Sequence, residues 1–287
     1  MAPSSKIVVT GALGNVGAEV VKTLMAQGIP VRAVARDTAQ LRERFGDGVE
    51  AVAFDFTRPD TYATAFTGAD RMFLMRPPQI TNVKKEMIPA LEAAQSAGVR
   101  HVVFLSLIGI EQNQRVPHYA VEQYLKTSSL SYTFLRCSFF MQNLNTTHRA
   151  EIRDRSELYV PVGSGRTSFV DVRDIGAVAA LALTQPGHAN CAYDLTGSEA
   201  LDYYQVADIF SEVLGRPITY RNPSPFRFFL RQLRDGTSLP FAVVMTWLYG
   251  STRKGMAAQV TDDIRRLLDR PPIQFRTYVA DYQDAWR

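Results

Sequence analysis

The segment KIVVTGALGNVG, Lys6 to Gly17, decides the fold of this chain. Its first five residues are mostly β-branched and apolar, which predicts a buried strand ending at Thr10. Glycines then recur at a spacing of three, so the backbone can turn sharply and the next helix can pack tightly on the strand. A strand, a glycine-rich turn and a helix in this order predict a dinucleotide-binding domain. An ordinary tight turn is the alternative.

The glycine loop supplies the first candidate binding residues. In such a turn, a pyrophosphate lies on free N–H groups at the helix start, where the helix dipole favours negative charge. We expect the helix over residues 16–27, because apolar side chains recur there at helical spacing and stop before Gly28. The expected cofactor contacts are Gly11, Leu13, Gly14, Asn15, Val16 and Gly17.

Arg36 follows the second expected strand, at residues 30–35. A site that prefers NAD usually has an acidic residue here, hydrogen-bonded to the ribose hydroxyls. Arg36 instead offers a planar cationic fork that suits a 2′-phosphate. The sequence therefore predicts NADP(H) as the cofactor, although Asp37 follows one position late.

Strand-like and helix-like segments alternate through residue 136. Further strands are expected at residues 49–53, 71–75, 101–105 and 132–135, and helices most clearly at 81–97 and 117–128. This alternation predicts an α/β fold of the Rossmann type, a doubly wound parallel sheet covered on both faces. The later chain predicts a smaller, mostly helical C-terminal substrate lobe. We expect residues 1–156 with 168–196 to form the NADP-binding domain, and 157–167 with 197–287 the lobe.

Residues after the other strands are further candidates for cofactor binding, because open α/β sheets bind ligands at the carboxyl ends of their strands. Asp55 could accept a hydrogen bond from the adenine amino group, and Phe56 could pack near the ring. A helix cap before Pro59 is the equal alternative for Asp55. Loop position alone would also explain the remaining candidates, which are Met75, Arg76, Pro77, Ser106 and Leu107.

Composition argues against several other classes. The chain is 46% apolar and 21% charged, as globular proteins are, and its net charge of +4 is too dispersed for a nucleic-acid partner. The longest apolar run, residues 239–249, is far shorter than the roughly 20 residues of a membrane span, so no membrane partner is expected. Two cysteines and no apolar signal-peptide core predict a cytoplasmic setting. No metal is expected, because no His/Cys cluster has metal-ligand spacing.

These motifs together resemble the NmrA-like family of atypical short-chain dehydrogenase/reductases. The resemblance covers essentially the whole chain and rests on VVTGALGNVGAEVV, VRAVARD, GVRHVVFLS, SLSYTFLRCSFFMQNL and YDLTGSEALDYYQVADIFSEVLGR. The family includes NADPH-dependent quinone reductases, isoflavone-reductase relatives, triphenylmethane-dye reductases, and regulators that bind NADP without turning it over.

The catalytic residues of better-known dehydrogenases are missing. None of the twelve tyrosines is followed four residues later by lysine, and the isoflavone-reductase lysine, fifteen residues before Thr133, is replaced by His118. The dye reductases are similar in carrying histidine there, so the resemblance makes His118 the catalytic candidate, able to donate a proton near neutral pH. A half-exposed histidine that binds a ribose or caps the helix is the alternative. Glu122, one turn on, would orient His118 or lie on the solvent face.

By the same resemblance, the segment after the sixth strand runs beside the nicotinamide. Cys137 and Phe139 are expected to contact the cofactor. The expected substrate contacts are Phe139 and Phe140 as walls and Asn143 as a polar contact. Trp247, from an aromatic cluster in the second half, would close the pocket over a flat substrate, or else lie in the core of the lobe.

Two functions follow from these observations. The first is an NADPH-dependent oxidoreductase that transfers hydride directly to a quinone-like, azo or dye-like aromatic acceptor. Such acceptors disperse the added charge, so positioning matters more than a catalytic acid. The second is a non-catalytic NADP(H) sensor. The expected partner is accordingly a small aromatic substrate or a protein, and the chain would act as a monomer or homodimer.

Overall fold

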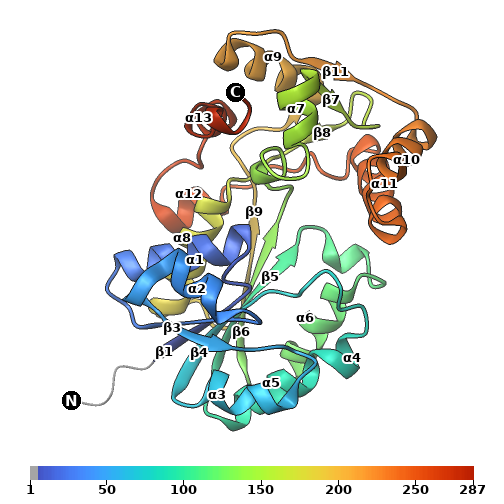
Figure 1. The fold of residues 1–287 in the computed structure, drawn as a ribbon. Coiled ribbons are helices and arrows are strands. Elements are labelled where there is room, and N and C mark those ends of the chain that lie inside the picture. The colour runs from blue at the N-terminus through green and yellow to red at the C-terminus, as the bar shows by residue number, and fades with distance from the viewer. Residues whose placement is uncertain (1–5) are drawn as a thin grey trace. The chain divides into compact units, whose positions relative to one another are not determined.

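A computed structural model describes residues 6–287 (Figure 1). These residues form two compact units. The first runs to Cys137 and takes in Val172–Leu195, and the second comprises Ser138–Asp171 and Thr196–Arg287. Residues 138–156, 168–171 and Thr196, which the sequence assigned to the first domain, belong to the second unit. The physical reason is their packing, since Met141, Leu144 and Ile152 lie in the hydrophobic core of that unit.

The first unit is built on a seven-stranded parallel sheet with the order β3-β2-β1-β4-β5-β6-β9. The strand order reverses between β1 and β4, which is the switch point where open α/β sheets bind ligands. The predicted Rossmann-type doubly wound sheet is confirmed. Its strands are β1 (Lys6–Thr10), β2 (Val31–Ala35), β3 (Glu50–Ala53), β4 (Ala69–Leu74), β5 (His101–Leu107), β6 (Ser131–Cys137) and β9 (Cys191–Leu195).

Helices cover both faces of this sheet (Figure 1). On one face, α1 (Asn15–Ala26) crosses α8 (Val172–Thr184) closely, because a Cβ on Gly176 would come within 2.8 Å of the Glu19 Cβ. On the other face, α3 (Tyr62–Phe66), α5 (Ile88–Ser96) and α6 (Pro117–Thr127) share a core with Phe104 and Phe134. Helix α2 (Thr38–Phe45) contacts β2 and β3.

The helix expected over residues 81–97 is two helices, α4 (Val83–Glu86) and α5. Pro89 explains the break, because it has no N–H to donate to the carbonyl four residues earlier and it favours the first turn of a new helix. The described chain also contains short 3-10 helices at Gly46–Gly48, Pro59–Thr61, Ile110–Gln112, Met141–Asn143 and Gln283–Ala285.

The second unit is mostly helical. It contains α7 (Arg149–Arg155), α9 (Tyr203–Leu214), α10 (Pro225–Arg234), α11 (Leu239–Arg253), α12 (Asp263–Leu268) and α13 (Phe275–Asp281). Strand β7 (Glu157–Tyr159) pairs with β11 (Thr219–Arg221), and β8 (Arg166–Thr167) pairs with β10 (Leu201–Asp202). Its core includes Phe210, Phe275 and Trp286. Within residues 6–287, no helix has both the length and the apolar character to cross a membrane.

Candidate cofactor site

The Thr10 hydroxyl, just before the glycine loop, connects the ends of β1 and β4 by hydrogen bonds. The Thr10 hydroxyl donates to the carbonyl of Phe73 at 3.0 Å and accepts from the N–H of Met75 at 2.9 Å. Gly11 has a φ of +64°, which favours glycine, and a Cβ on Gly17 would come 2.2 Å from the Gly11 carbonyl oxygen. The first and third glycines are therefore required by this backbone path.

The start of α1 has the free N–H groups that an anion needs. Gly14 caps the helix in an extended conformation, and no side chain of the described residues forms a capping hydrogen bond there. The first turn carries no acidic residue, and the N–H of Ala18 is already bonded to the Gly14 carbonyl at 3.0 Å. The N–H groups of Asn15, Val16 and Gly17 therefore have no helical acceptor and suit a pyrophosphate.

Arg36 is exposed just after β2 and forms no hydrogen bond or ion pair within residues 6–287. Its neighbour Asp37 caps α2 instead, accepting from the N–H groups of Ala39 and Gln40 at 2.9 and 3.3 Å. The Gln40 and Ala39 hydrogen bonds lower the pKa of Asp37. Asp37 therefore caps the helix, and Arg36 is the side chain that remains available to bind a cofactor.

Arg44 is a second cation near the loop, and the sequence interpretation missed it. From the end of α2, its Nη1 donates to the carbonyl of Leu13 at 2.7 Å. No spacing rule connects two residues that are 31 positions apart. The only signal was a basic residue in the last turn of the helix after the second strand.

The surroundings of Phe56 and Asp55 differ from those expected of adenine-binding residues. Phe56 is buried in the core, with its ring 4.7 Å from that of Phe54, so its ring is not available to pack against adenine. Asp55 is half-buried and accepts from both the N–H and the hydroxyl of Thr57 at 2.8 Å. It fixes a turn rather than capping the short helix that begins at Pro59.

The loop after β4 lies against the glycine loop. A Cβ on Gly11 would come 2.3 Å from the Met75 Cε, so this methionine covers the first glycine. Arg76 donates through Nη1 to the carbonyls of Pro77 and Ile80 at 2.9 and 2.6 Å, while its buried Nε has no partner within the described chain. Burial lowers the pKa of Arg76. Arg76 thus organises its own loop and keeps one unpaired N–H.

His118 lies in the first turn of α6 with its ring 5.9 Å from that of Phe104. Burial, together with the charge of Arg76, lowers the pKa of His118 to about 3. Its Nδ1 is buried without a partner among residues 6–287. This environment opposes the expected proton donation near neutral pH, because the imidazole stays neutral. It leaves His118 as a group that can exchange hydrogen bonds with a ligand.

Ser106 and Glu122 lie in the interior, contrary to the expectations for both. The Ser106 hydroxyl donates to a Glu122 carboxylate oxygen at 2.7 Å, and both side chains are fully buried. Glu122 also pairs with Arg136 at 2.8 Å. It therefore neither orients His118 nor faces solvent. Leu107, the next residue of β5, is half-buried.

Cys137 ends β6 as a buried thiol, and burial raises its pKa. It is therefore an unreactive packing residue. The candidates beyond it belong to the second unit. There the Phe139 ring is 6.4 Å from that of Tyr249, Phe140 forms a β-bridge with Val170, and the Asn143 carbonyl accepts from the His148 N–H at 3.0 Å.

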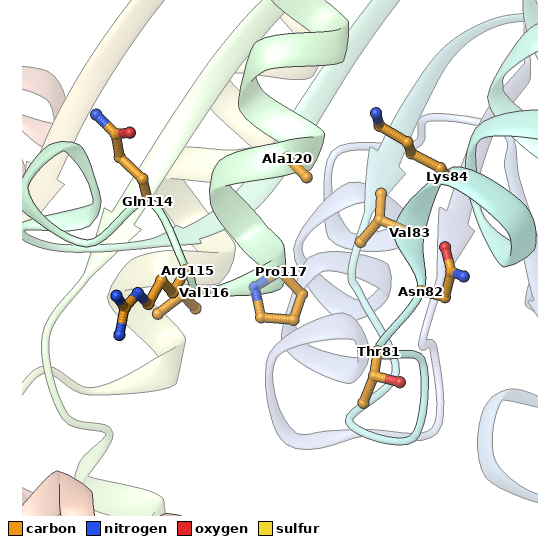
Figure 2. Close-up of a pocket in the computed structure, with 9 residues that line it drawn as sticks. All are labelled: Thr81, Asn82, Val83, Lys84, Gln114, Arg115, Val116, Pro117 and Ala120. Atoms are coloured by element: carbon orange, nitrogen blue, oxygen red, sulfur yellow. The ribbon is translucent and has the colours of Figure 1, made fainter.

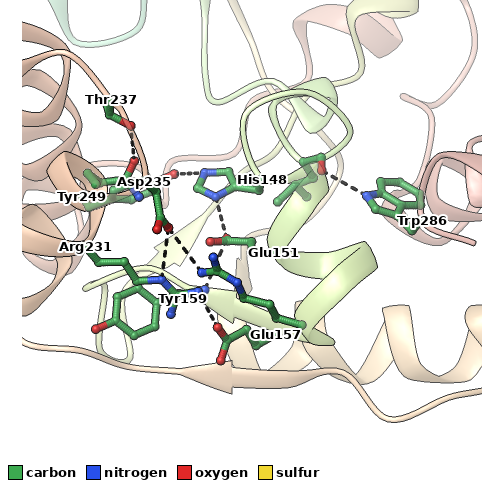
Figure 3. A network of polar contacts seen from close by, with 12 residues as sticks. His148, Glu151, Glu157, Tyr159, Arg231, Asp235, Thr237, Tyr249 and Trp286 are labelled. Atoms are coloured by element: carbon green, nitrogen blue, oxygen red, sulfur yellow. Dashed lines mark hydrogen bonds and ion pairs between the residues drawn. The ribbon is translucent and has the colours of Figure 1, made fainter.

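The aromatic cluster of the second half is divided by the structure. Phe228 and Tyr249 are buried in the core, whereas Trp247 is 52% exposed on α11. Figure 3 shows the polar network around Tyr249, where His148 lies between the Tyr249 hydroxyl at 2.5 Å and the Glu151 carboxylate at 2.7 Å. Sequence gave no signal for this network, since His148 and Tyr249 are 101 residues apart.

A cavity of about 350 Å³ lies between the starts of α4 and α6 (Figure 2). Its walls include Asn82, Lys84, Arg115 and Pro117, and none of the predicted site residues lines it. The first unit therefore brings together the glycine loop, Arg36, Met75, Arg76 and His118 at the carboxyl ends of its strands, and none of these residues lines the cavity.

This chain is similar to known proteins over most of its length. The model of the NmrA-like family matches residues 3–260. An NAD(P)H azoreductase from Xenophilus azovorans is 34% identical over 288 residues, which cover 98% of this chain and 99% of that protein. The structure of Citrobacter sp. triphenylmethane reductase complexed with NADP(H) has a TM-score of 0.83 and 26% identity, covering 96% of this chain and 99% of that one.

The NADPH-dependent quinone oxidoreductase of Escherichia coli, solved with NADPH, has a TM-score of 0.87 at 21% identity, covering 96% of this chain and 99% of that one. At this identity the likeness concerns the fold alone. The family match and the azoreductase both extend over most of the chain. The resemblance inferred from the motifs is confirmed, and the chain belongs to the NmrA-like family, alongside NAD(P)H-dependent oxidoreductases.

Proposed function

We propose that this protein is an NADPH-dependent reductase that passes hydride directly to a quinone-like, azo or dye-like aromatic acceptor. The observation that carries the proposal is the uncapped start of α1 behind a glycine loop, with the unpaired Arg36 after the next strand. The azoreductase and the dye reductase described above support the acceptor class, since both are named for reduction of aromatic dyes.

The residues present fit NADP(H). The N–H groups of Asn15, Val16 and Gly17 would hold the pyrophosphate, and Arg36 would pair with the 2′-phosphate through its guanidinium. Arg44, bonded to the Leu13 carbonyl, adds positive charge beside the loop. The unpaired Arg76 Nε and His118 Nδ1 are further polar atoms that a ligand would satisfy. When bound, the cofactor supplies the hydride.

The chain's own residues would act mainly by positioning the cofactor and the acceptor, and less by acid catalysis. His118 is neutral in its buried setting and can fix a ligand by a hydrogen bond, but it is a poor proton donor near pH 7. Ser106, which donates to Glu122, has no free proton to direct at a substrate. Aromatic acceptors disperse the added charge and can be reduced without a general acid. Reduction of a simple ketone would lack the roughly 10²–10⁴-fold rate enhancement that a general acid contributes.

On the substrate side, we propose that Phe139, Phe140 and Asn143 contact the acceptor. Phe139 and Phe140 are half-buried, so each keeps some surface for a ligand. Cys137 would contribute its backbone alone, because its thiol is buried within the sheet.

The decisive experiment measures NADPH oxidation by the purified protein against quinones, azo dyes, triphenylmethane dyes and a simple ketone, without added flavin. We expect turnover of at least one aromatic acceptor and none of the ketone. His118→Ala should retain measurable turnover, since it loses a hydrogen bond rather than an acid. Tight NADPH binding without any turnover would overturn the reductase and favour the NADP(H) sensor acting through a protein partner.

A further inference from the structure

Helices α10 and α11 pack side by side as a hairpin (Figure 1). This hairpin exposes much apolar surface. Seven of the ten large apolar side chains that are exposed in residues 6–287 lie on these two helices, each 47–69% exposed. Exposed apolar residues are normal when scattered, but a concentration marks an interaction surface. We call these seven the hairpin surface: Phe226, Leu230, Leu239, Phe241, Val243, Val244 and Trp247.

The hairpin surface is not needed to hold the hairpin in place. Other residues of the same helices supply the core contacts, because Phe228, Ala242 and Met245 are buried. Tyr249 is buried as well, and its hydroxyl is bonded to His148 (Figure 3). Trp247 is two residues from Tyr249 and about 200° around the helix, so the two point to opposite sides. Each helix therefore has one covered side and a second apolar side that is left open.

Basic residues accompany this open apolar surface. Arg227, Arg231 and Arg234 recur along α10 at positions i, i+4 and i+7, beside Phe226 and Leu230. Arg231 is engaged by the Glu157 carboxylate at 2.5 Å and lies over the Tyr159 ring at 3.9 Å.

Arg227 and Arg234 have no such partner. Both are exposed and form no ion pair within the described residues, while the neighbouring Asp235 is paired with Arg155 and Arg231. Arg253 and Lys254, at the end of α11, are exposed too. The free charge beside the hairpin surface is therefore positive.

We propose that the hairpin surface docks on an anionic phospholipid bilayer. Amphipathic helices with arginines on one side and Phe, Leu and Trp on the other lie in the plane of a bilayer interface. Anionic headgroups would neutralise the charges of Arg227 and Arg234. The indole of Trp247 is of the kind that lies at the interface between headgroups and acyl chains. A second copy of the chain fits less well, because a symmetric contact brings the same basic stripe from both copies to one interface. This peripheral docking requires no spanning helix and does not depend on the proposed reductase activity.

The chain carries its own reporter for this docking. It has two tryptophans, of which Trp286 is fully buried and Trp247 is half exposed. The full chain is mixed with vesicles of phosphatidylcholine alone, or with about one third phosphatidylglycerol, and followed by tryptophan emission and co-sedimentation. We expect a shift of the emission to shorter wavelength with the anionic vesicles, little change with the neutral ones, and reversal at high salt. Trp247→Phe should abolish the emission shift while retaining sedimentation.

Charge variants separate docking from general attraction. Arg227→Gln with Arg234→Gln should weaken binding to the anionic vesicles about tenfold or more. Lys85→Gln with Arg265→Gln removes the same charge from exposed positions elsewhere and should leave binding unchanged. Equal losses for the two pairs, or no binding to anionic vesicles at low salt, would overturn the proposal. So would a dimer in sedimentation equilibrium that Trp247→Ser dissociates, since the surface would then be covered by a second copy.

Discussion

Glu122 and Arg136 form a buried ion pair, with Arg136 Nη2 2.8 Å from one carboxylate oxygen and Nε 3.1 Å from the other. The Glu122 side chain is 1% exposed and that of Arg136 is 10% exposed. The pair ties α6 to β6, and the Ser106 hydroxyl adds β5 to the same contact. One carboxylate therefore connects three elements whose ends meet beside the proposed cofactor site.

Removing one partner of the Glu122–Arg136 pair should lower the free energy of unfolding more than removing both. Arg136→Met leaves the buried Glu122 carboxylate with Lys126, 3.8 Å away, as its one cationic partner among the described residues. The loss of unfolding free energy should therefore approach the about 3–5 kcal/mol that is typical of breaking a buried pair. The double variant Glu122→Met with Arg136→Met should recover part of that loss, because neither charge remains buried. Urea unfolding of the single and double variants measures the difference. A double variant that loses the sum of the two single effects would show that the two residues do not interact.

Alanine substitutions in the glycine loop should have effects that differ with the space around each glycine. A Cβ on Gly17 would lie 2.2 Å from a backbone oxygen, whereas one on Gly14 would lie 3.3 Å from the same oxygen. Gly17→Ala should therefore lower the midpoint of thermal unfolding and abolish NADPH binding. Gly14→Ala should keep the fold and weaken NADPH binding, because the methyl group intrudes where the pyrophosphate approaches. Gly250→Ala, also in a helix and with nothing within 4 Å, is the control; it should leave NADPH binding unchanged and should not lower the midpoint of unfolding.

The local patterns of the sequence predicted the sheet well. Strand β1 ends at Thr10 as expected, and β2 and β3 each begin one residue later than expected and end at the expected residue. Helix α1 lies within one residue of its expected range at both ends. These features depend on residues that are neighbours in the chain. The split of α4 from α5 was missed, although Pro89 carried the signal.

The environment of the candidate site could not be predicted in the same way. Phe56 and Ser106 follow expected strands, which makes them candidates, but their burial depends on Phe54 and Glu122, which face them only in the folded chain. The neutral state of His118 likewise depends on burial and on Arg76, 42 positions away in the sequence. Position along a strand indicates which edge a residue reaches, and tertiary contacts decide whether it is available.

Arg36 and Arg44 should affect the choice of cofactor differently. Arg36→Ala should weaken NADPH binding by about one to two decades and leave NADH binding nearly unchanged, since a hydrogen bond to a charged group contributes roughly 1.5–3 kcal/mol. Arg44→Ala should weaken both cofactors, because it supports the Leu13 carbonyl of the shared loop. Titration followed by cofactor fluorescence measures all four affinities. Arg42→Ala, exposed on the same helix, is the control; equal losses for the two cofactors in Arg36→Ala would refute the 2′-phosphate contact.

Stability should fall on mild acidification because two histidines are held neutral. Burial lowers the pKa of His118 to about 3 and that of His101 to about 4, both from 6.5. Between those values and pH 6.5 the unfolded chain binds more protons than the folded one, so the stabilisation is complete above 6.5 and is lost as pH falls. Each histidine contributes at most about 1.4 kcal/mol per pH unit. Urea unfolding at pH 7 and pH 5 should show a smaller loss for His118→Gln than for the unaltered chain.

Tyr249 should stabilise the second unit through its hydroxyl as well as its ring. The Glu151 carboxylate can only accept, so His148 donates to it through Nδ1, and in a neutral imidazole Nε2 then accepts from Tyr249. Tyr249→Phe keeps the ring contacts with Phe139 and Phe228 but leaves this buried nitrogen without a partner, which should cost about 1–3 kcal/mol of unfolding free energy. Tyr204→Phe, on an exposed ring of α9, should change it by less than about 0.5 kcal/mol. Equal effects of the two substitutions in urea unfolding would mean that the hydroxyl of Tyr249 contributes nothing through His148.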